Sequence, residues 1–179
     1  MLLLDVKTDD VTDYKETSIY IAFPYCTGKC GDECQNRHLR GIYPSLNVTA
    51  SDIYRLYSNL KTHKAVVMAG LEPLDSFDDV LDIVEEFFSR VKPVDIVIFT
   101  GYNYNEYKEQ FEEKLIQIVK NAKRPEGKKL IVKIGRYDNV NYPGSWFCKT
   151  LGVNLATKNQ FTITYLPDGT GYIDKFKED

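Results

Sequence analysis

The sequence predicts an α/β fold built on a parallel sheet that helices cover. The chain alternates short apolar runs with segments of helical periodicity, and the apolar runs contain few polar residues. Strands that are apolar throughout are typical of parallel sheets, whose two faces are both covered. With 179 residues and 43% hydrophobic content, the chain is long enough for one core and short for two, so we expect a single domain over residues 1–179.

The expected elements alternate along the chain. Strands are predicted at 18–23 (SIYIAF), 65–69 (AVVMA), 94–99 (VDIVIF) and 129–134 (KLIVKI), and helices at 51–61, 77–91 and about 105–121. Ser76 precedes the second helix and is expected to cap it. Near the C-terminus, Pro167-Asp168-Gly169 separates two β-prone runs, which indicates a hairpin at the edge of the sheet.

Charge and hydropathy argue against two kinds of partner, nucleic acid and a membrane. The formal net charge of −3 provides no broad basic surface, which argues against non-specific binding to nucleic acid. The apolar run at the start of MLLLDVKTDD is far shorter than the apolar core of a signal peptide or a membrane span, and no later apolar run reaches that length. We therefore expect a cytoplasmic protein, in which clustered cysteines more often bind metal than form disulfides.

Three of the four cysteines stand in one loop after the first predicted strand. Cys26, Cys30 and Cys34 are separated by three residues each, and His38 extends the same interval. On a continuous helix Cys26 and His38 would lie about 18 Å apart, too far to share one metal. The loop must therefore fold back, and glycines at 28 and 31 allow the backbone angles that this requires.

Two kinds of metal site are compatible with this loop. With His38 as the fourth ligand, the site is a closed Cys3His zinc site. With the cysteines alone, it is a [4Fe–4S] cluster in which one iron lacks a cysteine ligand.

The ends of the predicted strands carry further candidate residues. The cysteine loop follows the first strand, AGLEPL the second, TGY the third and GRY the fourth. Ligands of α/β sheets bind at the carboxyl ends of the parallel strands, so these segments are expected to meet at one edge.

These motifs resemble those of the radical S-adenosylmethionine superfamily, in particular the small activating proteins of anaerobic ribonucleotide reductase. The matching segments are the cysteine loop with Cys34-Gln35-Asn36, Gly70-Leu71-Glu72-Pro73-Leu74, Thr100-Gly101-Tyr102, Gly135-Arg136-Tyr137 and Asn159-Gln160. They occur in the order of the family and span about residues 18–165. The chain departs from the family at three points: it has three residues rather than two before Cys34, Glu33 in place of an aromatic residue, and Leu71 in place of the second glycine.

The resemblance implies an incomplete TIM-like barrel that holds one [4Fe–4S] cluster and S-adenosylmethionine. The implied cluster ligands are Cys26, Cys30 and Cys34, and the implied cofactor-binding residues are Asn36, Gly70, Leu71, Glu72, Thr100, Lys133, Arg136 and Asn159. Five of these have a second interpretation from the residues alone. Glu72 can be a surface acid at a strand end, Lys133 can extend its amine from a strand end, and Arg136 can pair with a surface acid. Thr100 and Asn159 can satisfy turns. Cys148, beside Trp146 and Phe147, is expected to be a buried packing residue.

The implied reaction is the reductive cleavage of S-adenosylmethionine to methionine and a 5′-deoxyadenosyl radical, with transfer of the radical to a glycine of the partner. The implied partners are the large subunit of anaerobic ribonucleotide reductase and an electron donor of the flavodoxin or ferredoxin type. Two alternatives stay open: a radical S-adenosylmethionine enzyme for a small molecule, and a non-catalytic Cys3His zinc-binding interaction module.

Overall fold

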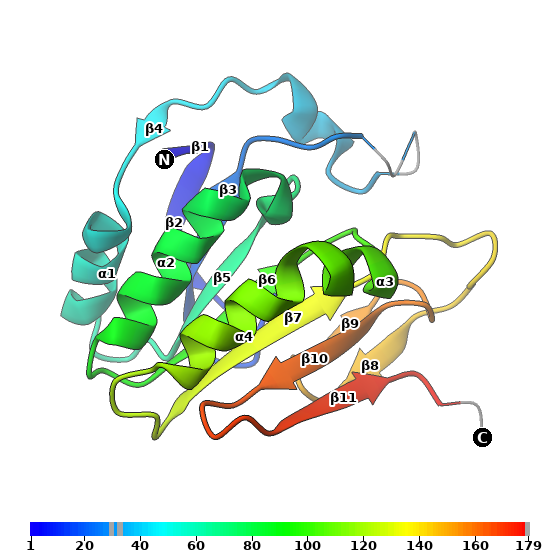
Figure 1. Cartoon of the computed structure of the whole chain (residues 1–179). Helices are drawn as coiled ribbons and strands as arrows, with labels where there is room; N and C mark the ends of the chain where they lie inside the picture. The colour runs from blue at the N-terminus through cyan, green and yellow to red at the C-terminus, as the bar shows by residue number, and fades with distance from the viewer. Residues whose placement is uncertain (29–30, 32–33, 178–179) are drawn as a thin grey trace.

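The structure is a computed structural model that describes residues 1–28, 31 and 34–177. Its largest sheet contains β2 (Asp5–Asp10), β3 (Ser18–Phe23), β5 (Ala65–Gly70), β6 (Val94–Phe99), β7 (Lys128–Ile134), β10 (Phe161–Tyr165) and β11 (Gly171–Lys175). These seven strands follow the order β11-β10-β7-β6-β5-β3-β2 (Figure 1). All four predicted strands are therefore confirmed, and they are neighbours at the centre of the sheet.

The sheet is mixed, with parallel pairing at its centre and antiparallel pairing toward its edges. The four central strands β3, β5, β6 and β7 pair in parallel, whereas β2, β10 and β11 pair antiparallel to their neighbours. The predicted C-terminal hairpin is confirmed, since β10 and β11 pair over their full length and β11 forms one edge. The prediction of a mainly parallel sheet with a C-terminal edge hairpin is thus right for the centre of the sheet and for the β10–β11 edge, and it did not include the antiparallel edge strand β2.

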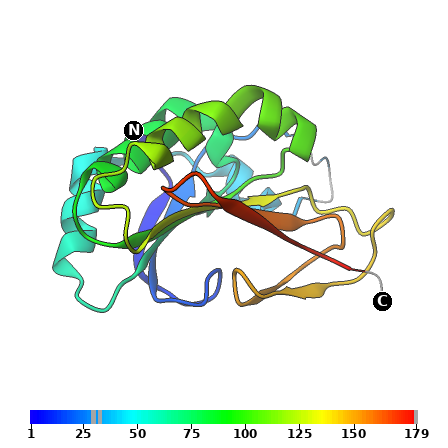
Figure 2. The same ribbon diagram turned by 60° about the horizontal axis from the view of Figure 1, so that its bottom comes forward.

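The helices lie between successive central strands and cover one face of the sheet. They are α1 (Ala50–Asn59), α2 (Phe77–Ser89), α3 (Tyr104–Tyr107) and α4 (Glu113–Lys120), and a π-helical turn, Lys108–Glu112, joins the last two. Figure 2 shows them together above the sheet. Apolar side chains of the helices, such as Val84, Phe87 and Leu115, pack with Ile96 and Val132 of the strands in the larger core cluster.

The start of α2 differs from the sequence prediction. Ser76 occupies the N-cap position, but its side chain makes no capping hydrogen bond. The reason is that Pro73–Ser76 already forms a 3₁₀ helix that leads directly into α2. In contrast, α1 begins with a capping box between Thr49 and Asp52, in which each side chain accepts from the other residue's backbone N–H.

Two hairpins cover the opposite face of the sheet, and the sequence analysis predicted neither of them. One is the loop between β2 and β3, and the other joins β8 (Trp146–Cys148) to β9 (Val153–Leu155). Their tips meet where the Lys15 N–H donates to the Leu151 carbonyl at 2.7 Å, and Figure 2 shows them below the sheet. Cys148 is fully buried in the apolar cluster on this side, as predicted.

Several smaller features complete the described chain. β1 (Leu2–Leu3) pairs with β4 (Leu46–Asn47), and a 3₁₀ helix spans Arg37–Gly41. None of the helices in the described residues is both long and apolar enough to cross a bilayer. Helices on a single face, and a sheet with separate edges at β2 and β11, are compatible with an incomplete barrel, which stays a prediction.

Candidate cofactor site

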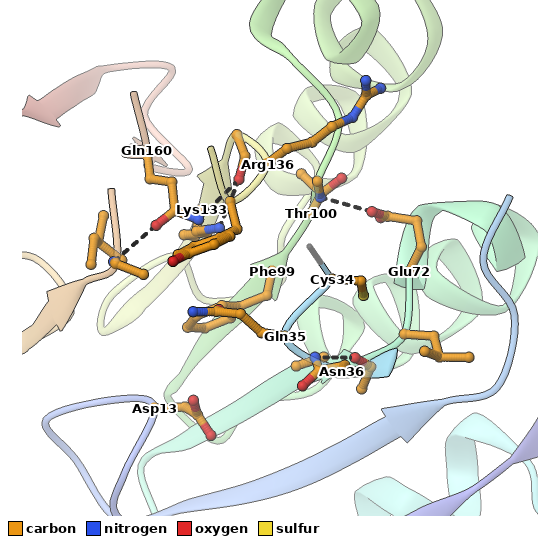
Figure 3. Close-up of a pocket in the computed structure, with 18 of the residues that line it drawn as sticks. Asp13, Cys34, Gln35, Asn36, Glu72, Phe99, Thr100, Lys133, Arg136 and Gln160 are labelled. Atoms are coloured by element: carbon orange, nitrogen blue, oxygen red, sulfur yellow. Dashed lines mark hydrogen bonds between the residues drawn. The ribbon is translucent and has the colours of Figure 1, made fainter. Parts of the chain in front are cut away.

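A cavity of about 490 Å³ lies at the carboxyl ends of the central strands, on the face opposite the helices. The predicted site residues that line it are Cys26, Cys34, Asn36, Gly70, Leu71, Glu72, Thr100, Lys133 and Arg136 (Figure 3). The expectation that the four strand ends converge is therefore confirmed. Cys30, the third predicted ligand, lies outside the described residues.

Backbone hydrogen bonds attach the first part of the cysteine loop to the segment after β5. The Leu71 N–H donates to the Phe23 carbonyl at 3.0 Å, and the Glu72 N–H donates to the Tyr25 carbonyl at 2.8 Å. At the closing end of the loop, the Asn36 side-chain amide donates to the Gly70 carbonyl at 2.6 Å. The last residue of β5 and the segment after it thus hold both ends of the loop that carries the cysteines.

Two glycines turn the cysteine loop between these attachments. Gly28 and Gly31 have φ angles of +75° and +60°, and the Gly31 N–H donates to the Gly28 carbonyl at 2.9 Å. These are left-handed conformations that glycine adopts without strain. Both glycines thus have the backbone angles that the predicted reversal of the loop requires.

Gly70 permits the close approach of β5 to β3 beside the cysteine loop. Its φ angle is +90°, and a Cβ atom at this position would lie 2.7 Å from the Phe23 backbone nitrogen. Backbone atoms cannot move aside as a flexible side chain can, so only glycine fits. The resemblance to a glycine-containing cofactor turn therefore has a steric basis at Gly70.

Glu72 presents a buried carboxylate at the cavity wall. Its side chain accepts hydrogen bonds from the Gly101 N–H at 2.7 Å and from the Leu74 N–H at 3.1 Å. Burial raises the pKa of Glu72 from its ordinary 4.5 to about 7, although these N–H donors and the Thr100 hydroxyl oppose the rise. When ionised, a carboxylate in this position has the charge to bind a cation such as an ammonium group.

Two cationic side chains reach the cavity from β7 and the segment that follows it. Lys133 is 8% exposed, and its ammonium donates to the Gly135 carbonyl at 2.8 Å. The Arg136 guanidinium forms an ion pair with Glu106 at 3.0 Å, and Figure 3 shows its side chain extending away from Cys34. Of the two interpretations of Arg136, the structure therefore shows the pairing with an acid.

In the Asn159-Gln160 pair, the residue that lines the cavity is Gln160 and not the predicted Asn159. Asn159 is not among the residues that line the cavity; its side-chain amide donates to the Arg136 carbonyl at 2.9 Å. Gln160 does line the cavity, is 3% exposed, and donates to the Gly135 carbonyl at 3.3 Å. Asn159 thus supports the turn after β7, and Gln160 contributes the surface.

His38, the candidate fourth ligand of a zinc site, is exposed on the 3₁₀ helix Arg37–Gly41 and does not line the cavity with Cys26 and Cys34.

Sequence reasoning missed several groups near the site. Asp13 and Tyr20 line the cavity, and burial raises the pKa of both, that of Tyr20 to about 12. Asp75 joins the cysteine loop to Tyr102 through its two carboxylate oxygens. The spacing of Asp75 three residues after Glu72 is the one signal in the sequence that could have drawn attention to it.

Comparison with known families identifies the chemistry of the cysteine loop. No curated protein and no solved structure matches the chain. A family model described as a 4Fe–4S single cluster domain matches residues 17–129, which include the cysteine loop, Glu72 and Thr100 but end before Lys133. Because this match covers more than half of the chain, the protein belongs to the 4Fe–4S single cluster domain family.

Proposed function

We propose that the protein is a radical S-adenosylmethionine activase that generates a glycyl radical on anaerobic ribonucleotide reductase. The observation that carries the proposal is the shared cavity, in which Cys26 and Cys34 lie with the buried carboxylate of Glu72 at the ends of the central strands. Cluster binding alone needs only the thiolates, whereas recognition of the amino acid group of S-adenosylmethionine would also use the carboxylate.

The described residues fit the two cofactors. The thiols of Cys26 and Cys34 are soft ligands that suit iron, and His38 lies apart from them. Glu72 has the charge to bind the ammonium of S-adenosylmethionine, and Lys133 has the charge to bind its carboxylate. When held by these thiols, a reduced [4Fe–4S] cluster would supply the electron for the reductive cleavage of S-adenosylmethionine.

The open sheet favours a macromolecular substrate. β2 and β11 form separate edges of the described sheet, but the β2–β3 loop and the β8–β9 hairpin cover its inner face, so a partner protein would approach the cavity from the carboxyl ends of the central strands. With few residues available for additional walls, a partner's own loop would complete the enclosure of the reacting atoms. This supports hydrogen abstraction from a backbone glycine of a large partner, with a flavodoxin or ferredoxin as electron donor.

The test is transfer of the radical. The reconstituted protein, S-adenosylmethionine, a reductant and anaerobic ribonucleotide reductase are mixed without oxygen, and electron paramagnetic resonance is recorded. The expected result is the doublet of a glycyl radical on the reductase, absent when its glycine is replaced by alanine. Formation of 5′-deoxyadenosine without any glycyl signal would contradict the activase assignment.

A small-molecule substrate is the second candidate. It is favoured by the extent of the cavity, which continues from Glu72 along the inner face to Asp13 and Asn154. A substrate bound there would be modified without a partner protein. Product formation from small molecules in the absence of a reductase distinguishes this candidate from the first.

A further inference from the structure

The carboxylate of Asp75 connects two loops that border the candidate site. Asp75 itself is not among the residues that line the cavity. Its Oδ2 accepts from the Thr27 N–H at 2.6 Å, and its Oδ1 accepts from the Tyr102 hydroxyl at 2.7 Å. Thr27 belongs to the cysteine loop, and Tyr102 follows β6. Both oxygens are thus occupied by specific donors from segments far apart in the sequence.

The position of Thr27 makes this contact important for a cluster ligand. The Thr27 N–H belongs to the peptide unit directly after Cys26, and a peptide unit is planar. Holding this N–H in place therefore fixes the backbone angle ψ of Cys26. The following amide, the Gly28 N–H, donates to the Cys26 sulfur at 3.3 Å.

The other attachments of the loop do not replace this one. The contacts of Phe23 and Tyr25 with the segment after β5 are made by backbone atoms before Cys26, and any side chains at these positions allow them. Between Cys26 and Gly28, Asp75 provides a contact that depends on the identity of a side chain.

We propose that Asp75 is a positioning residue for the iron–sulfur cluster, which holds the turn Cys26–Gly28 so that the Gly28 N–H stays bonded to the Cys26 sulfur. Hydrogen bonds to cluster sulfurs stabilise the more negative, reduced state and so raise the reduction potential. Tyr102 orients the Asp75 carboxylate. The inference rests on ligation of the cluster by Cys26 and not on cleavage of S-adenosylmethionine, so it can fail or succeed independently of the proposed function.

The test compares Asp75→Ala, Asp75→Asn and Tyr102→Phe as reconstituted proteins with wild type. Asp78→Asn is the matched control, since Asp78 is an exposed acid in the first turn of α2. The measurements are the midpoint potential of the cluster, by redox titration with paramagnetic resonance, and amide hydrogen exchange at Thr27 and Gly28.

The expected result is a graded series. Asp75→Ala shifts the potential to a more negative value and speeds exchange at both amides by about tenfold, as expected for one lost hydrogen bond. Asp75→Asn keeps the potential and the exchange rates close to wild type, because its oxygen accepts from Thr27 while its amide donates to the Tyr102 oxygen. Tyr102→Phe gives an intermediate shift, and Asp78→Asn gives none.

Two outcomes would overturn the inference. One is a wild-type potential with wild-type exchange at Thr27 and Gly28 in Asp75→Ala. The other is an Asp75→Asn protein as impaired as Asp75→Ala, since this would mean that the charge and not the hydrogen-bonded geometry matters. If Asp75→Ala does not fold or bind a cluster, Tyr102→Phe and Asp75→Asn decide: unchanged potential and exchange in Tyr102→Phe would contradict the proposal.

Discussion

The Glu72 carboxylate accepts a hydrogen bond from the Gly101 backbone N–H at 2.7 Å, across the ends of two adjacent strands. Glu72 follows β5 and Gly101 follows β6, so the contact joins the second and third motifs of the site. The same side chain is 7% exposed and lines the cavity with Cys26 and Cys34. A buried acid in this position contributes both to the shape of the site and to its dependence on pH.

The first prediction concerns the pH dependence of stability. Because the pKa of Glu72 is about 7 in the folded protein against an ordinary value of 4.5, folding favours its neutral form. Its contribution to stability is therefore present at low pH and is lost as the pH rises through about 7. Relative to Glu72→Gln, wild type should lose about 3 kcal/mol of unfolding free energy as the pH rises from about 4.5 to about 7.

Urea unfolding without cofactors, from pH 4.5 to 8, measures this difference. The exposed Glu109 provides a control, since Glu109→Gln should follow the wild-type curve. Parallel curves for wild type and Glu72→Gln would show that Glu72 ionises freely and would contradict the prediction.

The second prediction separates metal ligands from other cysteines. Alanine at Cys26, Cys30 or Cys34 should abolish the [4Fe–4S] cluster in anaerobically reconstituted protein, because each removes one thiolate. Cys148→Ala should retain it, since Cys148 is buried among apolar side chains beneath the sheet. Iron, sulfide and zinc content per chain are the measurements.

A zinc site would give a different pattern of metal content. Zinc bound at one ion per chain, retained through reconstitution and lost in His38→Ala, would contradict the ligand set. The exposed position of His38 leads us to expect that His38→Ala keeps its cluster.

The third prediction tests the close approach of backbones at Gly70. Gly70→Ala should lower the unfolding free energy by about 1 to 3 kcal/mol from backbone strain alone, and the contact with the Phe23 nitrogen adds to this. It should also reduce cluster loading, since the Gly70 carbonyl accepts from Asn36. Gly41→Ala is the matched control, because no heavy atom lies within 4 Å of its new Cβ. Equal stability of the two variants would contradict this account.

The central strands and the convergence of their ends could be predicted because both depend on local sequence patterns. An apolar run such as SIYIAF identifies a buried strand, and the parallel arrangement then brings the following loops together. β2 escaped prediction because Val6 is its single apolar residue, as suits a partly exposed edge strand. The β8–β9 hairpin escaped because its strands are short, with three residues each.

The partners of individual polar side chains could not be predicted, because they depend on contacts between distant segments. Asp75 and Thr27 are 48 residues apart in sequence, and Arg136 and Glu106 are 30 apart. No periodicity encodes such pairs. Likewise, whether Asn159 or Gln160 faces the cavity depends on how their turn packs against Gly135, whose carbonyl accepts from Gln160.

The most direct test of the account is the cleavage of S-adenosylmethionine by the reconstituted and reduced protein. Adding S-adenosylmethionine should perturb the paramagnetic resonance spectrum of the cluster, and 5′-deoxyadenosine and methionine should then form in equal amounts. Glu72→Ala should weaken binding by about tenfold to a hundredfold, as the cofactor ammonium loses a buried acceptor. An intact cluster whose spectrum does not respond to S-adenosylmethionine, with no 5′-deoxyadenosine formed, would contradict the central claim.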